Sequence, residues 1–555
     1  MDIEQVVRKY ALQNAVQYGG KATLSSVLGK VMAENPDLRP KAKEITAVAK
    51  GIVEEINLMS PEDQKKALES ESPELLIKET KTREVGLPDL KNVQGEVRMR
   101  MAPNPSGPLH VGHSRMGVLN DEYVKRYGGI CYNRFEDTDP ARIDPDGYRT
   151  IPEDFQWLGV RIDKTIIQSD RFEIYYDIAK KLLEMGKAYV CTCKPEVWRE
   201  LKNQKKPCPH REQPLAEQMV RWNKMFDGSY KPEEASLMVK TDLQHPNPAI
   251  RDFVGLRIDD TPHPRTGTKY RVYPLMNLAV AVDDHLLDLT HVLRGKDHLN
   301  NTFRQMYIYD YFGWKKPEYI HYGRVRIPDS QLSTSKMAKG IRDGQYSGWD
   351  DIQLGTLRAL KRRGLRPQAL RRYWIETGIK EVDIEFSWKT LYSFNRELID
   401  GDANRYFFVA NPVKIRIEGA PKLVGRAPAH PEHPERGVRE LTVGPDNEVY
   451  LEQRDLASDP KRLRLKDLCN IERSGEGWKY AGNDLGVLKE GVQIVHWVPA
   501  DAIAAEVLMT DGTALEGLTE KGLVDAKGKV VQLERFAYVM VEETSPFVRC
   551  VFTHK

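Results

Sequence analysis

The chain has 555 residues and a mass of 63.6 kDa, which at about 100–200 residues per domain is enough for three to five domains. Lys and Arg total 84 against 81 for Asp and Glu, so the net charge of +3 excludes a protein that binds polyanions through its overall field. No stretch reaches the roughly 18 apolar residues of a membrane span and no secretory signal opens the chain, so we expect a cytoplasmic protein without a membrane partner.

Four regions follow one another along the chain. The first shows apolar residues at helical spacing, the second alternates short apolar strands with helical segments, the third returns to helix, and the last shows strand-like runs between turns. The α/β alternation is typical of a parallel sheet, and the last pattern of barrels. We predict a multidomain α/β protein with a helical domain over residues 1–95, a parallel-sheet domain over 96–345 interrupted by an insertion at about 170–270, a helical connector over 346–403 and a β-barrel region over 404–555. The first of these ends in a turn-rich link near Leu87-Pro88, and it either docks a partner protein or braces the rest of the chain.

The stretch from Glu96 to Gly117 predicts a phosphate-binding loop. A half-buried strand is followed by a Pro- and Gly-rich loop, and helical spacing resumes after Leu109. His110 and His113 therefore lie at a strand–loop–helix junction, where free backbone N–H groups and the helix dipole favour a phosphate. Two imidazoles one helical turn apart can donate to one polyphosphate, and Gly112 would let a flat adenine lie against the backbone. The alternative is a pair of surface histidines without a shared ligand.

At this point the sequence resembles a known family. MAPNPSGPLHVGHSR is similar to the first signature of class I aminoacyl-tRNA synthetases, and specifically of their glutamyl/glutaminyl branch. RFEDTDP, WLGV, VDDHLLDLTHVLRGKDH, LSTSK and SWKTLYSFNRELID follow in the order that this branch shows. The resemblance implies a Rossmann-type domain that activates an amino acid with ATP and Mg²⁺. It also implies an insertion that receives the tRNA acceptor end and, as in the archaeal type, β-barrels that read the anticodon.

The resemblance implies roles for residues of both signature loops. His110, His113 and Lys336 would be the catalytic donors. In the second loop the position that usually carries the ATP-contacting lysine is Thr334, which makes Lys336 the leading replacement and Lys339 the alternative. In isolation, such a Ser/Thr/Lys loop is an ordinary surface turn. The implied ATP-binding residues are Gly107, His110, Gly112, His113, Ser333, Ser335 and Lys336.

An acidic substrate needs a fixed cation in its pocket, whereas an amide needs a matched donor and acceptor. By resemblance, Arg100 would bind the substrate γ-carboxylate and Glu136 the substrate ammonium. Glu136 and Asp139 favour glutamate over glutamine, for which the branch tends to read RFDDTNP. The full set of implied amino-acid-binding residues is Arg100, Ala102, Asn104, Glu136, Tyr273 and Arg294.

Structural roles are the alternatives for several of these side chains. Arg100 would then pair with an acid on the neighbouring strand, Arg294 with Asp297 or Asp284, and Glu136 with Arg134 or Arg142. Tyr273 is included because Met276 occupies the position of the usual pocket tyrosine.

Three of the six cysteines and one histidine form a Cys-x-Cys…Cys-x-His pattern. Three thiolates and an imidazole complete a tetrahedral Zn²⁺ site with no open position, which predicts a structural metal. The alternative is three unrelated free cysteines. The predicted ligands are Cys191, Cys193, Cys208 and His210, and the remaining Cys131, Cys469 and Cys550 are expected in the core.

Basic residues are concentrated between Arg358 and Lys380, directly after the second signature. This helical face is well placed to contact tRNA phosphates, although such a face is often simply solvated. Tyr373 and Trp374 within it either stack on bases or belong to the core. The predicted tRNA-binding residues are Arg358, Lys361, Arg362, Arg363, Arg371 and Arg372.

The resemblance therefore implies a two-step reaction in which L-glutamate is joined to AMP and then transferred to the 3′ end of tRNA-Glu. The sequence leaves open whether tRNA-Gln is also charged. Three rivals are a glutaminyl-tRNA synthetase, a nucleotidyltransferase that shares H-x-G-H but uses no tRNA, and a non-catalytic RNA-binding relative. We expect a monomer that does not bind DNA.

Overall fold

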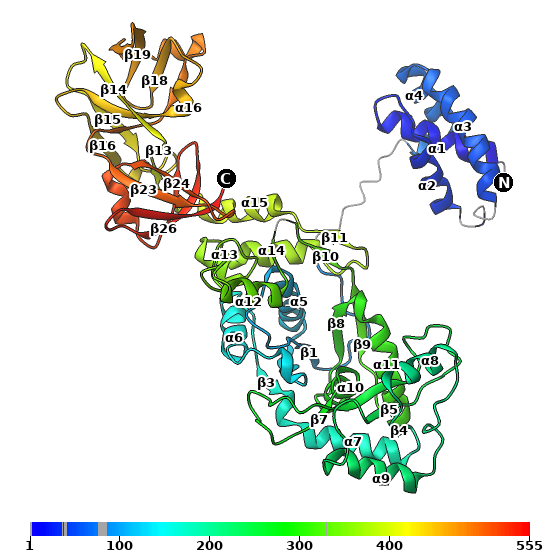
Figure 1. Ribbon diagram of the computed structural model, residues 1–555. Coiled ribbons are helices and arrows are strands. Elements are labelled where there is room, and N and C mark those ends of the chain that lie inside the picture. The colour runs from blue at the N-terminus through cyan, green and yellow to red at the C-terminus, as the bar shows by residue number, and fades with distance from the viewer. Residues whose placement is uncertain (1–2, 36, 38–40, 76–85, 329) are drawn as a thin grey trace. The chain divides into compact units, whose positions relative to one another are not determined.

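The computed structural model describes residues 3–35, 37, 41–75, 86–328 and 330–555 (Figure 1). Two compact units make up the chain, Met1–Glu84 and Val85–Lys555. None of the described helices combines the length and the apolar character that a membrane crossing requires.

The N-terminal unit is helical, as predicted. Val7, Ala11 and Ala15 lie on the buried face of its first helix, because they recur at helical spacing. Ser60 caps the last helix by accepting a hydrogen bond from the backbone N–H of Asp63. Part of the predicted link before Leu87 falls on residues 76–85, which lie outside the described residues. The helices are α1 (Ile3–Gln17), α2 (Leu24–Glu34), α3 (Ala42–Leu58) and α4 (Pro61–Glu71).

Two parallel sheets form the base of the larger unit. The first has the order β1-β2-β3 and the second pairs β8 with β9. They meet where the Thr290 N–H donates to the Arg98 carbonyl at 3.0 Å, which places β8 beside β1. The carboxyl ends of these parallel strands therefore share one edge. The strands are β1 (Val97–Met101), β2 (Gly129–Phe135), β3 (Lys164–Ile167), β8 (His291–Gly295) and β9 (Glu318–Tyr322), and the helices beside them α5 (Val111–Tyr127), α6 (Gly147–Trp157) and α11 (Leu299–Phe312).

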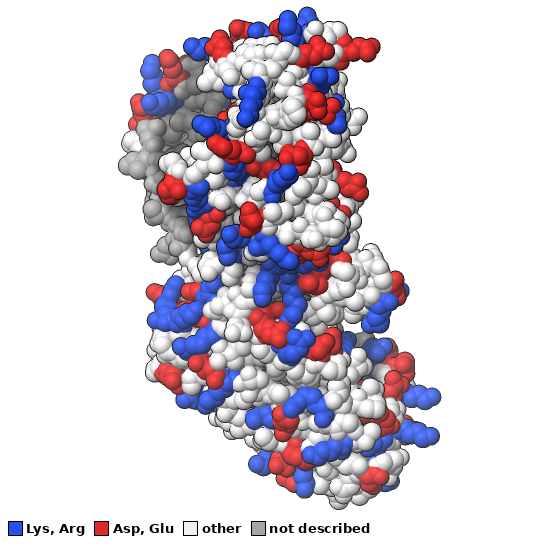
Figure 2. All heavy atoms as spheres, turned by 90° about the vertical axis from the view of Figure 1, so that its left-hand side faces the viewer, with Lys and Arg blue, Asp and Glu red and all other residues white. Residues whose placement is uncertain are grey.

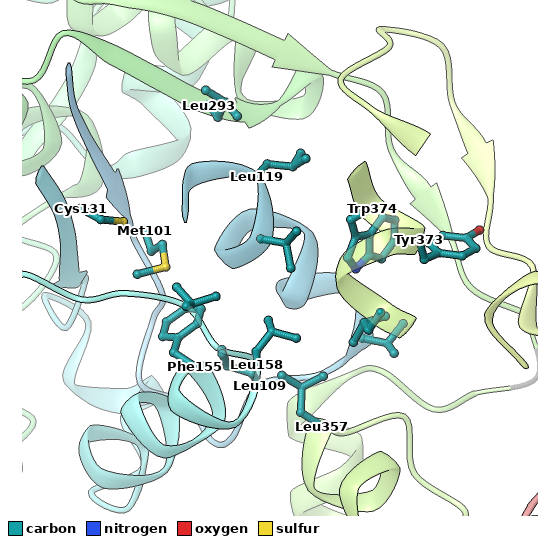
Figure 3. Packing of buried hydrophobic residues seen from close by; sticks show 14 of the residues in the cluster. Met101, Leu109, Leu119, Cys131, Phe155, Leu158, Leu293, Leu357, Tyr373 and Trp374 are labelled. Atoms are coloured by element: carbon teal, nitrogen blue, oxygen red, sulfur yellow. The ribbon is translucent and has the colours of Figure 1, made fainter. Parts of the chain in front are cut away.

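A tightly packed core joins these helices (Figure 3). Phe155 of α6 packs so closely on Gly117 of α5 that a Cβ there would lie 2.7 Å from the phenylalanine ring. Trp374 is fully buried in the same cluster, and its indole N–H donates to Ser114 Oγ at 2.7 Å. Tyr373 is also buried, so both aromatic residues belong to the core and are not available for stacking on bases.

A four-stranded antiparallel sheet interrupts the α/β pattern. Its core includes Tyr175, Leu237 and Leu278, contributed by helices on one face and by the strands themselves. The strands are β4 (Ala188–Cys191), β5 (Ser236–Val239), β6 (Phe253–Ile258) and β7 (Val272–Pro274), and the helices α7 (Phe172–Glu184), α8 (Pro195–Asn203), α9 (Leu215–Phe226) and α10 (Met276–Leu286).

Short helices and a two-stranded parallel ladder follow. The helices are α12 (Thr334–Arg342), α13 (Leu357–Arg362), α14 (Pro367–Thr377) and α15 (Trp388–Ile399), and the ladder pairs β10 (Val325–Arg326) with β11 (Ile384–Glu385).

The C-terminal region is β-rich, as predicted. Two seven-stranded sheets have the orders β12-β25-β26-β27-β23-β24-β13 and β21-β18-β19-β20-β14-β17-β22, and β15 pairs with β16. Separate cores lie under the two large sheets, one including Trp497 and the other Val539. Cys469 and Cys550 lie in these cores and Cys131 in that of the α/β region, as expected.

The bounds in the first half of this region are β12 (Arg405–Tyr406), β13 (Phe408–Ala410), β14 (Pro412–Glu418), β15 (Val424–Pro428), β16 (Val438–Thr442), β17 (Glu448–Glu452), α16 (Gln453–Leu456), β18 (Arg462–Leu465), β19 (Cys469–Ser474) and β20 (Gly477–Tyr480). Those in the second half are β21 (Gln493–Val495), β22 (Trp497–Pro499), β23 (Ile503–Leu508), β24 (Ala514–Thr519), β25 (Val530–Leu533), β26 (Ala537–Glu543) and β27 (Val548–His554).

Candidate active site

The two histidines lie at the start of α5, at the junction predicted from the sequence. His110 is the N-cap, and its Nδ1 accepts a hydrogen bond from the Gly112 N–H at 3.0 Å. His113 Nδ1 in turn accepts from the His110 N–H at 3.4 Å, which completes a reciprocal capping box. The rings stack with their centroids 3.7 Å apart.

These hydrogen bonds define the protonation of the pair. Each Nδ1 accepts a hydrogen bond from a backbone N–H, so in the neutral rings the proton is on Nε2. Burial and the neighbouring His113 ring lower the pKa of His110 well below its ordinary value, and burial lowers the pKa of His113 to about 4. The pair is therefore neutral at pH 7 and presents two Nε2–H donors.

The second signature packs against the first. A Cβ on Gly107, whose φ is +141°, would lie 2.9 Å from Thr334 Cγ2, so glycine permits this approach. Thr334 begins α12 where a loop was expected, and Lys336 and Lys339 follow on its first turns, both exposed. Ser333 Oγ and Ser335 Oγ lie 3.2 Å apart at the start of this helix.

A cluster of buried guanidinium groups lies at the carboxyl ends of the parallel strands. Arg134 of β2 contacts Asp284 at 2.5 Å and Glu136 at 2.8 Å, and Arg100 of β1 lies 3.5 Å from Asp284. Arg294 of β8 donates to Gln305 Oε1 at 2.9 Å and to Thr302 Oγ1 at 3.2 Å. The sequence pattern predicted a half-buried strand β1, but Arg100 is only 4% exposed, and its guanidinium faces Asp284 of α10.

Charge in this cluster is not balanced. Arg100, Arg134 and Arg294 supply three positive charges, whereas Asp284 and Glu136 supply two negative ones. Burial would raise the pKa of Asp284, but the guanidiniums of Arg134 and Arg100 outweigh it and hold that pKa below its ordinary value. Burial and the charge of Arg100 lower the pKa of Arg294. The Nε atoms of Arg100, Arg134 and Arg294, and Oδ2 of Asp284, are buried without a hydrogen-bond partner among the described residues.

The structure corrects one of the predicted amino-acid-binding residues, Tyr273, and shows the contact of a second, Asn104. Tyr273 is fully buried among Phe172 and His263, and its hydroxyl donates to the Thr261 carbonyl at 3.3 Å, so it is a core residue of the insertion. Asn104 is exposed, and its amide donates to the Glu136 carbonyl at 2.8 Å.

Other predicted positions lie at the cluster itself. Ala102 is half-buried where β1 ends, and the carboxylate of Glu136 accepts from Arg134 as in the structural alternative. Arg294 pairs with neither acid proposed for it.

The predicted metal ligands converge. The ligand atoms of Cys191, Cys193, Cys208 and His210 all lie within 4.8 Å of one another. Sγ of Cys191 lies 3.7 Å from Sγ of Cys208, and His210 Nδ1 lies 3.8 and 3.4 Å from Sγ of Cys191 and Cys193. A tetrahedral Zn²⁺ with bonds of about 2.3 Å to sulfur and about 2.05 Å to nitrogen requires separations of about 3.8 Å between two sulfur atoms and about 3.6 Å between sulfur and nitrogen. Both the donor chemistry and the spacing therefore fit zinc.

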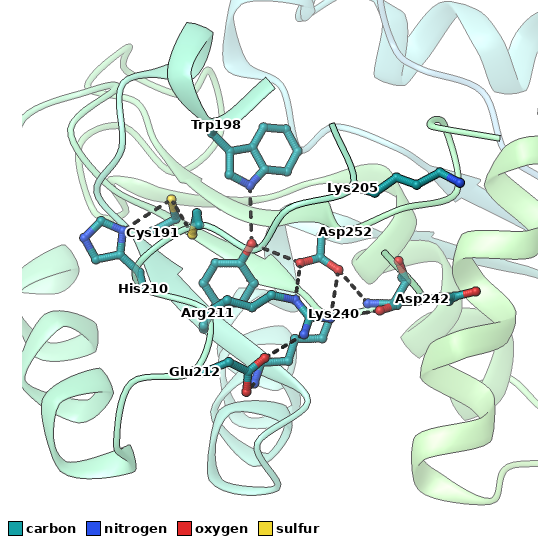
Figure 4. Close-up of polar contacts among 12 residues, drawn as sticks. Cys191, Trp198, Lys205, His210, Arg211, Glu212, Lys240, Asp242 and Asp252 are labelled. Carbon is teal, nitrogen blue, oxygen red and sulfur yellow. Dashed lines mark hydrogen bonds and ion pairs between the residues drawn. The ribbon is translucent and has the colours of Figure 1, made fainter. Parts of the chain in front are cut away.

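Polar anchors hold this cysteine cluster on the sheet (Figure 4). Thr192 Oγ1 lies 3.0 Å from His210 Nε2, which leaves Nδ1 for a metal. Arg211, the next residue, contacts the buried Asp252 at 2.8 Å, and Asp252 also accepts from the Tyr189 hydroxyl at 3.0 Å.

Most of the predicted tRNA-binding cations are already paired within the chain. Arg358 contacts Glu153, Arg362 contacts Glu542, Arg371 contacts Asp121, and Arg372 contacts both Glu376 and Glu397.

Arg363 is a correction to the predicted set. It is 4% exposed and donates to the carbonyls of Phe552 and Thr553, so it holds the C-terminal strand and cannot reach a phosphate in this packing. Of the six, Lys361 and Arg363 have no ion pair among the described residues, and of these two only Lys361 is exposed. Over the face that Figure 2 shows, acidic and basic side chains are intermixed.

The sequence analysis named Arg134 and Asp284 only as alternative ion-pair partners, and not as members of the site. Arg134 lies two residues before Glu136, and residues at that spacing share a face where a strand continues. Asp284 follows the apolar run 278–282, and an acid after such a run on one helix indicates a buried charge that needs partners.

Comparison with known proteins agrees with this arrangement. Residues 96–401 match the family described as "tRNA synthetases class I (E and Q), catalytic domain", and residues 403–484 match its anti-codon binding domain. The glutamate–tRNA ligase of Thermoplasma volcanium is 48% identical over 99% of this chain and 100% of its own length. That of Methanocaldococcus jannaschii is 48% identical over 100% of both chains, and that of Thermoplasma acidophilum is 51% identical over 89% and 90%.

Among solved structures, a glutamate tRNA ligase from Elizabethkingia meningosepticum aligns at 22% identity and a TM-score of 0.37, over 55% of this chain and 70% of that one. Half of the chain matches the catalytic family model, and the curated relatives match it over nearly its full length. The chain therefore belongs to the class I tRNA synthetases of the E and Q group, and within that group to the glutamate–tRNA ligases.

Proposed function

We propose that this chain activates L-glutamate with ATP and transfers it to the 3′ end of tRNA-Glu. The α-carboxylate of glutamate attacks the α-phosphate of ATP, which enters with Mg²⁺, and pyrophosphate leaves. The 2′-hydroxyl of the terminal ribose then attacks the carbonyl of the glutamyl-adenylate and releases AMP. His110 and His113 donate from Nε2 to the phosphates, and Lys336 provides a cation from the second signature.

The unbalanced arginine cluster carries this proposal. Its excess positive charge is buried, and the Nε atoms of all three arginines lack a hydrogen-bond partner among the described residues. A side-chain carboxylate would neutralise that excess and accept the missing hydrogen bonds, whereas the neutral amide of glutamine would leave it uncompensated. We assign the γ-carboxylate to Arg100, with Arg294 beside it, and the substrate ammonium to the carboxylate of Glu136.

The remaining parts of the chain have supporting roles in this proposal. Cys191, Cys193, Cys208 and His210 would hold a structural zinc in an insertion that receives the acceptor end of tRNA. The Rossmann-type domain spans residues 96–345, a helical connector spans 346–403, and the β-barrel region from 404 onward reads the anticodon. Lys361 is the predicted phosphate contact that is free to meet tRNA.

Charging assays test the proposal directly. Labelled glutamate and labelled glutamine are each supplied with purified tRNA-Glu and purified tRNA-Gln, with ATP and Mg²⁺ present. Glutamate on tRNA-Glu is the expected product, and glutamate on tRNA-Gln as well would make the enzyme non-discriminating. Glutamine on tRNA-Gln would overturn the assignment of Arg100, and the absence of charging with either amino acid would refute the proposed reaction.

A further inference from the structure

The loop that carries the histidines is clamped by residues outside both signatures. The Leu109 N–H, directly before His110, donates to Asp154 Oδ2 at 2.8 Å. On the other side, the Leu109 carbonyl accepts from the Leu357 N–H at 2.9 Å, and the Val111 N–H donates to the Gly355 carbonyl at 3.0 Å. His110 is thus held in an antiparallel bridge with the backbone that begins α13.

Asp154 joins the two sides of this clamp. It lies on α6, is 4% exposed, and its Oδ1 lies 3.3 Å from Nε of Arg358, the second residue of α13. Arg358 also contacts Glu153 at 2.5 Å. The carboxylate of Asp154 therefore binds the backbone before His110 with one oxygen and α13 with the other.

The opposite end of α13 is fixed to the C-terminal sheet. Arg362 donates to both carboxylate oxygens of Glu542 on β26, at 2.6 and 3.0 Å. Next to it, Arg363 donates to the carbonyls of β27, and a Cβ on Gly364 would lie 2.5 Å from Val530 of β25. With six residues, α13 is about 9 Å long at 1.5 Å per residue, so little length separates the two attachments.

We propose that Asp154 and Arg358 are positioning residues for the reaction and that α13 transmits the placement of the C-terminal sheet, through Arg362 and Glu542, to the backbone of His110. This inference rests on the proposed function, because it assumes that the Nε2–H donors act on the reacting phosphate. A movement of the sheet that keeps the Arg362–Glu542 pair intact must move α13, and with it the bridge that holds His110. Donors that must lie within tenths of an ångström of a reacting phosphate are sensitive to such a movement.

Four single variants of the full-length enzyme test the idea by charging of tRNA with glutamate. Asp154→Ala removes the acceptor of the Leu109 N–H, and we expect kcat to fall by about 10²-fold with the KM values for ATP and tRNA changed less than about twofold. Asp154→Asn keeps an acceptor oxygen for that N–H but loses the charge opposite Arg358, so it should recover part of the loss. Glu542→Gln should lower kcat by about three- to tenfold, in the range of energetic coupling between distant sites.

Glu543→Gln is the matched control for Glu542, because Glu543 lies next to it on β26 but contacts Arg549 instead of α13. It should leave kcat at the wild-type value. Thermal unfolding and the active-site concentration of every variant separate misfolding from mispositioning.

Equal values of kcat for Glu542→Gln and Glu543→Gln would overturn the connection to the sheet. A normal kcat per active site in Asp154→Ala, or a loss confined to KM, would overturn the positioning role. Because each value is a ratio to the wild-type rate of glutamate charging, these failures are distinct from a failure of the proposed function, in which the wild type itself would not charge tRNA with glutamate.

Discussion

Replacing Arg100 by methionine should abolish most of the activity without destabilising the protein. In the free enzyme Arg100 is buried, lies 3.5 Å from Asp284 and makes no hydrogen bond among the described residues. With methionine there, Arg134 and Arg294 would balance Asp284 and Glu136, and the aliphatic part of the side chain would be kept. An unbalanced buried charge is unfavourable, so the midpoint of thermal unfolding should stay unchanged or rise.

Although the unfolding midpoint of Arg100→Met should not fall, its kcat/KM for glutamate should. Two hydrogen bonds between the guanidinium and a substrate carboxylate, at about 1.5–3 kcal/mol each, correspond to a loss of about 10²–10⁴-fold in kcat/KM for glutamate. The matched control is Arg134→Met on the neighbouring strand. Arg134 is fully buried and paired with both Asp284 and Glu136, so its removal should cost about 3–5 kcal/mol of stability.

Charging kinetics over a range of glutamate concentrations and thermal unfolding with and without glutamate provide both readouts. A midpoint that falls as far in Arg100→Met as in Arg134→Met would contradict the charge argument. An unchanged kcat/KM for glutamate would remove Arg100 from the substrate site.

Four further predictions follow from the site. His113→Ala should lower kcat by about 10²–10³-fold with little change in KM. Because the pKa of His113 is lowered to about 4, kcat should show no ionisation of this ring near pH 6.5, and the ring's contribution to stability, present above pH 6.5, should be lost as the pH falls toward 4. The protein purified without chelator should contain one zinc per chain, and Cys208→Ser should lower that content in elemental analysis. Lys361→Gln should reduce by about one the salt-dependence slope of tRNA binding in a filter assay, whereas Arg363→Gln should instead lower the midpoint of unfolding.

Local patterns in the sequence are sufficient to predict the histidine loop and the cysteine cluster. Both are built from residues close together in the chain, so spacing alone predicts that His110 and His113 share one helical turn and that Cys191 and Cys193 point to one metal. The helical N-terminus and the β-rich C-terminus are likewise predictable, because each repeats one hydrophobic period over a long stretch.

The arginine cluster and the basic run could not be predicted in the same way. The burial of Arg100 brings it to Asp284, more than 180 residues later, and no local sequence pattern indicates that contact. Similarly, the sequence around Arg362 indicates a solvated cation, whereas in the structure Arg362 pairs with Glu542, which is 180 residues later in the chain. Charge partners of this kind depend on tertiary packing. The sequence pattern of the basic run from Arg358 to Lys380 therefore indicates an RNA-binding surface even though most of its arginines are paired within the chain.

The stacked imidazoles also bear on how the enzyme turns over. Positively charged donors would retain pyrophosphate after its bond to AMP has broken, because a hydrogen bond from a cation to an anion is stronger than one from a neutral donor. His110 and His113 are uncharged at neutral pH, and their Nδ1 acceptors are occupied by backbone N–H groups, so in the proposed reaction their Nε2–H donors would attract the leaving group less strongly than cations would. We therefore expect the pair to favour rapid departure of pyrophosphate, with its retention dependent on the exposed lysines of α12.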